Sequence, residues 1–273
     1  MYIEESIVKK IIYFLFGGLL FNFVNAQAIP ISKVEYAILI PMLDESTQLI
    51  QDLKHKIYVN IDGIHYIKGS LMGNSVVFAN TGLGKTNMSL IAARLIHDFH
   101  PHFIFLAGSA GSINPALNKK SIVVGTRVMD ADLGTLTAQG AFYPNENYFS
   151  TPQKNNSPIS KEYISDSLIT KAAQSSLDQM PQNQVIFGAV ATSDILPNTT
   201  EQTTLLKYNK IDAVEMEGAS FMQVCWFFDV SCLVVRGISN NVDEEITEED
   251  TIQAGANAAK FVQYVINYLA QHV

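Results

Sequence analysis

The chain has 273 residues, 48% of them hydrophobic and 16% charged, and a formal net charge of −8 at pH 7. This composition supports a substantial apolar core and excludes a globally disordered chain. Nucleic-acid binding is disfavoured because no Lys/Arg cluster supplies the basic patch that phosphates require. No interdomain linker or internal repeat is visible, so we expect one domain over residues 29–273 and a small-molecule partner.

Residues 1–28 differ from the rest of the chain. The basic pair Lys9 and Lys10 precedes the apolar run Ile11–Phe21, and the segment that follows ends with the small residues Ala26 and Ala28. This pattern is typical of a secretory signal peptide, and the apolar run is too short to span a bilayer comfortably. We expect cleavage after Ala28, export to the periplasm or the medium, and no membrane attachment afterwards. An uncleaved anchor or a buried first helix is the alternative.

Apolar runs then alternate with segments of helical periodicity. Strands are predicted at Tyr36–Ile40, Ile64–Leu71, Ser75–Asn80, Phe103–Ala107, Ser121–Gly125, Gln184–Ala191, Ala213–Glu215 and Cys232–Arg236. Helices are predicted at Lys85–Phe99, Ile164–Leu177, Gly218–Phe228 and Ala254–Gln271, and a long surface loop at 140–160. Such alternation indicates a mostly parallel sheet covered on both faces, with ligands beyond the carboxyl ends of its strands.

Two features of the sequence are interpreted as structural and not as catalytic. Cys225 and Cys232 lie in apolar segments and are expected to be small buried hydrophobic side chains. Their spacing does not exclude a disulfide between them. Thr81–Thr86 ends like a phosphate-binding loop, but Ala79 occupies the position where that motif requires glycine. We therefore expect a glycine turn that opens the following helix. No Cys/His cluster has metal-ligand spacing, so no metal is expected.

Three patterns are candidates for a site. Residues 42–45 (MLDE) follow the first predicted strand, residues 108–111 (GSAG) end a central strand, and 214–218 (VEMEG) precedes 235–240 (VRGISN). Each pattern is weak alone, since acids beside a strand end are usually solvated and a small-residue turn is often only a packing point.

Two acids stand out by their surroundings. Glu215 and Glu217 lie between an apolar strand and an apolar helix, where burying an unpaired carboxylate is costly. They are either functional or part of a structural ion pair with Arg236. Cleavage of a ribosyl–base bond needs an activated water, a group that polarises the 2′- and 3′-hydroxyls, and a proton for the leaving base. Carboxylates supply the first two, and Ser109 with nearby amides can position water or ribose.

At these residues the chain resembles the nucleoside phosphorylase/nucleosidase superfamily, most closely the 5′-methylthioadenosine/S-adenosylhomocysteine nucleosidases. The resemblance runs from about Tyr36 to the C-terminus. Six motifs occur in the family's order and spacing: PMLDE, TGLGK, AGSAG, MDAD, VEMEG and VRGIS. The resemblance implies a three-layer α/β/α sandwich with a mixed sheet, a purine nucleoside as substrate, no organic cofactor or metal, and a homodimer.

The resemblance also implies roles for individual residues. Glu45 matches the acid that activates the attacking water, and Glu217 the acid that holds the ribose hydroxyls. Asn240 stands where the family has a catalytic aspartate. The expected substrate-binding residues are Met42, Ser109, Gly111, Leu196, Glu215, Met216, Arg236 and Ser239.

Hydrolysis is favoured over phosphorolysis. Phosphorylases of this type place arginines after the first strand and before the Gly-Ser loop. Here residues 42–46 and 105–107 contain no Arg or Lys, so a phosphate dianion would have no charged partner.

The chain departs from the family at the base. Asn240 cannot protonate a purine, but its amide can donate one hydrogen bond and accept another, which suits a 6-oxopurine at least as well as adenine. Leu196 replaces the usual stacking phenylalanine, and Asp194 or Asp243 is a less favoured substitute proton donor. We therefore expect a purine nucleosidase, with a possible shift to 6-oxopurine nucleosides. The alternatives are a purine nucleoside phosphorylase and a non-catalytic nucleoside-binding or storage protein.

Overall fold

The computed structural model describes residues 34–136, 142–144, 150–151, 157–158, 162–195, 206–207, 209–242 and 244–273. The expected signal peptide, Leu196 and Asp243 lie outside the described residues, as does most of the loop expected at 140–160.

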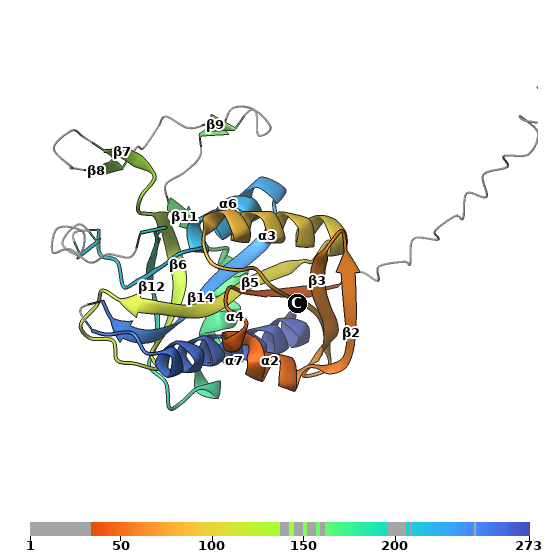
Figure 1. Cartoon of the computed structure of the whole chain (residues 1–273). Coiled ribbons are helices and arrows are strands. Elements are labelled where there is room, and N and C mark those ends of the chain that lie inside the picture. The colour runs from red at the N-terminus through yellow and green to blue at the C-terminus, as the bar shows by residue number, and fades with distance from the viewer. Residues whose placement is uncertain are drawn as a thin grey trace, which may run out of the picture. The chain divides into compact units, whose positions relative to one another are not determined.

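A mixed sheet forms the centre of the fold (Figure 1). Its strands, in spatial order, are β11 (Glu162–Ile164), β6 (Ile122–Asp130), β12 (Val185–Thr192), β13 (Ala213–Glu215), β5 (Phe103–Ser112), β1 (Tyr36–Ile40), β4 (Asn74–Asn80), β3 (Ile64–Leu71) and β2 (Lys54–Ile61). Strand β14 (Ser231–Asn241) pairs with both β5 and β6, so that β5, β13, β12, β6 and β14 close into a ring. Four short strands pair apart from this sheet: β7 (Gly134–Leu136) with β8 (Phe142–Pro144), and β9 (Ser150–Thr151) with β10 (Ser157–Pro158).

The longest ladders are parallel, as the alternation of strands and helices predicts. Strand β14 runs parallel to β5, β12 runs parallel to β6, and β1 is parallel to both of its neighbours. Antiparallel pairing occurs in the β2–β3–β4 meander, at β11, and where β13 and β14 meet β5 and β6 respectively.

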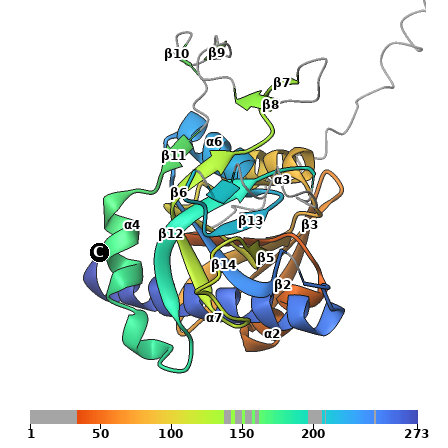
Figure 2. The same ribbon diagram turned by 90° about the vertical axis from the view of Figure 1, so that its left-hand side faces the viewer.

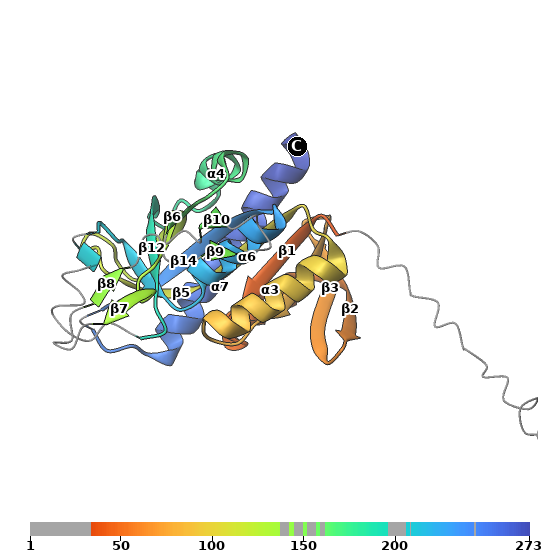
Figure 3. The same ribbon diagram turned by 90° about the horizontal axis from the view of Figure 1, so that it is seen from above.

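Helices cover both faces of the sheet, which confirms the expected three-layer α/β/α arrangement. On one face lie α3 (Lys85–Phe99) and α6 (Gly218–Phe228), and on the other lie α2 (Thr47–Asp52), α4 (Ser167–Gln174) and α7 (Glu248–His272), as Figures 2 and 3 show. Two short 3-10 turns complete the described helices, η1 (Asp44–Ser46) and η3 (Leu177–Gln179).

Strand β1 shows how the sequence builds two cores at once. Ala37 and Leu39 pack into the core beneath α3 and α6, whereas Ile38 and Ile40 pack into the core beneath α7. Successive side chains of a strand point to opposite faces, so a continuous apolar run fits only a strand buried on both sides. Ile38, Leu39 and Ile40 each contribute about 1.5–3 kcal/mol of burial free energy.

Most predicted elements are confirmed, and the differences have local causes. The helix expected at Ile164–Leu177 begins at Ser167, because Ile164 pairs in β11 and the Asp166 side chain accepts the N–H groups of Leu168 and Ile169. Strand β2 was not predicted. Its side chains are mostly exposed, so no apolar alternation marks it.

Cys225 and Cys232 are buried and free, as expected of small hydrophobic side chains. Within the part of the chain that the structure describes, no helix is both long and apolar enough to cross a membrane.

Candidate active site

The expected site residues converge on one pocket at the carboxyl ends of the central strands. Strands β1, β5 and β14 run parallel, so the segments that follow them meet at the same edge of the sheet. A cavity of about 270 Å³ opens there. It is lined by all the expected site residues that the structure describes: Met42, Glu45, Ser109, Gly111, Glu215, Met216, Glu217, Arg236, Ser239 and Asn240.

A larger cavity of about 510 Å³ lies elsewhere, between β11 and α6, and Tyr163, Met222 and Trp226 are among the residues that line it. None of the expected site residues lines that cavity. We assign the active site to the smaller pocket, because buried ionisable groups gather there.

Arg236 is the centre of a buried ion cluster. Its side chain is 1% exposed, and its Nη2 atom donates to Glu215 and, at 3.1 Å, to Oε2 of Glu217. The alternative of a purely structural pair fits Glu215, whose two oxygens also accept the N–H groups of Glu217 and Gly218 and the hydroxyl of Thr192. Glu215, expected among the substrate-binding residues, therefore holds the turn between β13 and α6 and orients Arg236.

Glu217 has fewer hydrogen-bond partners than Glu215. Its Oε1 atom accepts the backbone N–H of Gly84 at 2.8 Å, and its Oε2 atom accepts from Arg236. Burial raises the pKa of Glu217 to about 7; Arg236 opposes this rise, and the neighbouring Glu215 adds to it. The carboxylate is thus poised near neutral pH while it faces the pocket.

Glu45 reaches the same pocket from η1, just after β1. Its Oε1 atom accepts the N–H of Ser109 at 3.0 Å, whereas its buried Oε2 atom has no hydrogen-bond partner among the described residues. Burial raises the pKa of Glu45, although the hydrogen bonds from Ser109 and the charge of Arg236 lower it. A buried carboxylate with a raised pKa and a free oxygen is suited to accept a proton from water.

Three glycines shape the site by letting neighbouring groups come close. A Cβ atom on Gly255 of α7 would lie 2.6 Å from the Glu45 Cβ, and one on Gly108 would lie 2.4 Å from Nη1 of Arg236. Gly84, with a φ of +89°, donates its N–H to Glu217. Gly84 and Gly108 belong to the TGLGK and AGSAG motifs of the sequence, whereas no local pattern marks Gly255.

Asn240 is buried and lines the same pocket. Its Oδ1 atom accepts the Ser239 hydroxyl at 2.7 Å, and its Nδ2 atom donates to the carbonyl of Asn241 at 2.7 Å. These contacts hold the amide in one orientation at the pocket wall. Asp194, the other described candidate proton donor, does not line this pocket and accepts the N–H of Lys85 at 3.3 Å.

The pocket wall offers little to a metal or a phosphate. Among the described residues, no group of three His, Cys, Asp or Glu side chains is arranged to hold a metal ion. Arg236 is the only cationic side chain among the described residues that line the pocket, and it already pairs with two carboxylates.

Known proteins are similar to this chain in both sequence and fold. The chain is 29% identical over 233 residues to a 5′-methylthioadenosine/S-adenosylhomocysteine nucleosidase of Shewanella sediminis, covering 84% of this chain and 96% of the relative. The Neisseria meningitidis nucleosidase of that name, solved with methylthio-immucillin-A, superposes with a TM-score of 0.73 at 25% identity over 85% of this chain and 98% of its own. The Colwellia psychrerythraea enzyme, solved with adenine, gives 0.74 at 26% identity over 88% and 97%.

The match to a family is equally extensive. The sequence profile of the Phosphorylase superfamily matches residues 35–270, which span nearly all of the described structure. The chain therefore belongs to the Phosphorylase superfamily.

Proposed function

We propose that the protein is a purine-nucleoside N-glycosidase that hydrolyses the bond between ribose and base, in the manner of 5′-methylthioadenosine/S-adenosylhomocysteine nucleosidases. The observation that carries the proposal is the pair of buried acids, Glu45 and Glu217, whose pKa values are raised and which face one pocket around Arg236. The relatives that share the fold and most of the chain length are named for this reaction.

The two acids have separate tasks in the proposed mechanism. Glu45 accepts a proton from water through its free Oε2 atom, and the Ser109 amide holds the other oxygen in place. Ionised Glu217 accepts hydrogen bonds from the ribose hydroxyls and stabilises the positive charge that develops on the sugar as the base departs. The water oxygen bonds to the ribosyl carbon, and the departing base takes its proton from solvent, because the Asn240 amide cannot protonate it. Arg236 and Glu215 keep Glu217 in position, and Met216 packs beside the sugar.

Hydrolysis is the better fit than phosphorolysis. A phosphate nucleophile is a dianion at neutral pH and requires cationic partners. Since Arg236 is already bound by Glu215 and Glu217, the described pocket wall has no spare positive charge for it.

The preferred base is a finer part of the proposal. Asn240 offers an amide in place of a carboxylic acid, so it can hydrogen-bond to the purine but cannot protonate it. We propose that this shifts preference towards 6-oxopurine nucleosides such as inosine. If binding occurred without turnover, the observation would instead favour a nucleoside-binding or storage protein.

Two further proposals concern the whole protein. The pattern of residues 1–28 supports export after cleavage at Ala28, and the resemblance to the nucleosidases supports a homodimer. N-terminal sequencing of the exported chain and sedimentation velocity of the purified protein test them.

The deciding experiment measures base release by residues 29–273 from methylthioadenosine, S-adenosylhomocysteine, adenosine, inosine and guanosine, each with and without phosphate. Release that does not depend on phosphate supports the nucleosidase. Release only with phosphate identifies a phosphorylase. A folded protein that binds these nucleosides without releasing base contradicts catalysis altogether.

A further inference from the structure

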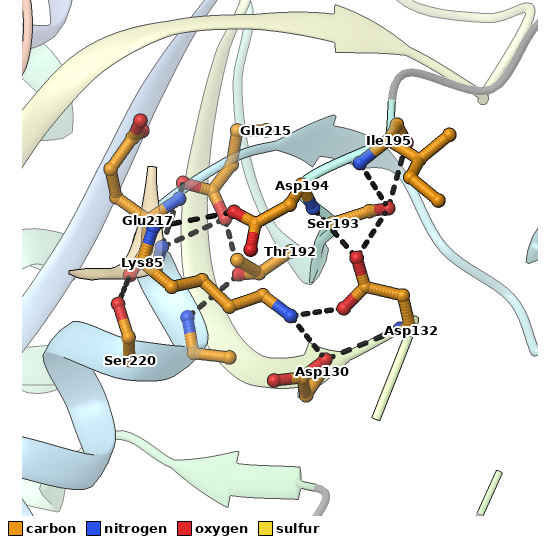
Figure 4. A network of polar contacts seen from close by, with 12 residues as sticks. Lys85, Asp130, Asp132, Thr192, Ser193, Asp194, Ile195, Glu215, Glu217 and Ser220 are labelled. Carbon is orange, nitrogen blue, oxygen red and sulfur yellow. Dashed lines mark hydrogen bonds and ion pairs between the residues drawn. The ribbon is translucent and has the colours of Figure 1, made fainter. Parts of the chain in front are cut away.

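Two of the motifs in the sequence have no task in the mechanism above, and the structure brings them together beside the pocket. Lys85 ends the Thr81–Lys85 motif and begins α3, while Asp130 and Asp132 belong to the MDAD motif at the end of β6. The Lys85 ammonium donates to Asp132 and, at 2.9 Å, to Asp130 (Figure 4). All three side chains are mostly shielded from solvent, since they are 13–22% exposed.

The contacts continue from Asp132 to the segment that follows β12. The second carboxylate oxygen of Asp132 accepts the Ser193 hydroxyl at 3.0 Å and the Asp194 N–H at 2.7 Å. Asp194 in turn accepts the backbone N–H of Lys85 at 3.3 Å. The contacts therefore form a closed set that begins and ends at Lys85. We call its members the Lys85 network: Lys85, Asp130, Asp132, Ser193 and Asp194.

The Lys85 network adjoins the ribose side of the proposed site. Gly84, the residue before Lys85, donates its N–H to Oε1 of Glu217 at 2.8 Å. Gly84 is the N-cap of α3 and has no side chain with which to cap the helix, so the first N–H groups are held by the side chains of Glu217 and Asp194. Its φ of +89° lies in the region that glycine adopts without steric cost. The direction of the Gly84 N–H thus depends on how Lys85 is held from its backbone and from its side chain.

We propose that Lys85 is a positioning residue that acts on the reaction through Gly84. By binding Asp130 and Asp132 it fixes the start of α3, so that the Gly84 amide stays directed at Glu217. This inference rests on the proposed function, because Glu217 is the acid that holds the ribose hydroxyls there.

A specific pH signature follows. Glu217 is faced by Glu215 from β13, by Arg236 from β14 and by the Gly84 N–H before α3, and Glu45 acts on it from η1 through the shared Arg236. The Gly84 hydrogen bond lowers the pKa of Glu217. If that amide is released, the pKa of Glu217 rises, and the ionised form is lost at a higher pH.

The test compares Lys85→Met with the wild-type mature chain in base-release kinetics from pH 5 to 9. We expect kcat/KM at pH 7 to fall about tenfold, since small misplacements of binding groups cost this much or more. The acidic limb of the profile should move to higher pH, and activity should recover in part above pH 8. Lys85→Arg retains the charge and should keep most of the kcat/KM that Lys85→Met loses.

Removal of a positive charge alone could also raise the pKa of Glu217, so two variants separate the causes. Ser193→Ala leaves every charge in place and removes one hydrogen bond to Asp132; it should shift the limb in the same direction by less. Lys119→Met removes an exposed lysine that pairs with Asp250 at 2.7 Å and should leave the profile unchanged. If Lys85→Met fails to fold, Ser193→Ala and Lys85→Arg carry the test.

A second readout needs no turnover. Hydrogen–deuterium exchange of the peptide containing Gly84, in protein without substrate, should quicken in Lys85→Met and stay unchanged in Lys119→Met. If the wild type releases no base but this exchange quickens, the proposed function fails while the hold on Gly84 stands. A Lys85→Met protein with wild-type exchange at Gly84 and a wild-type pH profile overturns the inference, even if it is less stable.

Discussion

Two regions of this molecule use the same ingredients, two carboxylates around one cation, for different ends. In the pocket, Arg236 holds Glu215 and Glu217, and all three side chains are at most 3% exposed. In the Lys85 network, Lys85 holds Asp130 and Asp132 in a region that water still reaches. The difference in burial decides what the carboxylates can do.

Desolvation dominates in the pocket, whereas in the Lys85 network it is outweighed at Asp132 but not at Asp130, whose pKa is raised by burial and by the neighbouring Asp132. Burial raises the pKa of Glu217 to about 7 in spite of Arg236. At Asp132 burial also acts to raise the pKa, but the hydrogen bonds from Lys85 and from neighbouring groups lower it overall. A carboxylate near its pKa can take part in chemistry, whereas one held firmly ionised serves to fasten loops.

The largest expected effect comes from removing either of the two pocket acids, Glu45 and Glu217. Glu45→Gln or Glu217→Gln should lower kcat for base release by about a thousandfold, because each removes a group that acts in the transition state. Circular dichroism should show that both variants remain folded. Asp44→Asn, which neutralises the exposed acid beside Glu45, is the matched control and should retain activity. Full activity in both glutamine variants would contradict the mechanism.

The raised pKa of Glu217 also predicts how stability depends on pH. The ordinary pKa of 4.5 applies to the unfolded chain, so between pH 4.5 and about 7 the folded protein binds more protons than the unfolded one. The resulting stabilisation is fully present below pH 4.5 and is lost as pH rises through 7. The loss is at most about 3 kcal/mol.

Urea denaturation at several pH values measures this loss. Glu45, whose pKa is also raised, contributes in the same direction. The difference between the wild type and Glu217→Gln therefore isolates Glu217: the variant should show a flatter decline between pH 4.5 and 7. Equal slopes for the two proteins would mean that Glu217 is not desolvated as described.

The sequence revealed the acids of the pocket more readily than the contacts that orient them. Glu215 and Glu217 were recognisable because apolar segments flank them, and an acid in such a place carries a cost that function can justify. The contact between Gly84 and Glu217 joins residues 133 positions apart, so no local pattern reports it. The packing of Gly255 against Glu45 is hidden for the same reason.

Among the elements of the fold, too, the sequence predicts local patterns better than long-range pairings. Strand β1 and helices α3 and α6 were predicted to within a residue, since their apolar patterns follow the period of the structure that they form. Strand β2 is mostly exposed, and its position is set by pairing with β3 rather than by its own side chains. Likewise, the ring that β14 closes between β5 and β6 depends on pairings that no single segment encodes.

Gly255 offers a way to disturb Glu45 without altering its charge. In Gly255→Ala the new methyl group would overlap the Glu45 side chain, at 2.6 Å from its Cβ, and should displace the carboxylate from the Ser109 amide. We expect kcat/KM to fall about a hundredfold, as for other misplaced catalytic groups. Asn257→Ala on the same helix controls for the gain in helix propensity. Wild-type activity in Gly255→Ala would show that Glu45 tolerates displacement.

The smallest effect concerns Asn240, an uncharged side chain that lines the pocket. In Asn240→Asp one carboxylate oxygen can keep the Ser239 hydrogen bond, but the other would face the Asn241 carbonyl, which now accepts from the amide at 2.7 Å. That oxygen must either carry a proton or turn away, and a buried, protonated acid can donate a proton to a purine. We expect the ratio of adenosine to inosine turnover to rise about tenfold, which corresponds to one well-placed hydrogen bond. The ratio is read from parallel base-release assays at pH 7, with Asn241→Asp as the matched control. An unchanged ratio would remove Asn240 from base selection and leave the preference to residues elsewhere in the pocket.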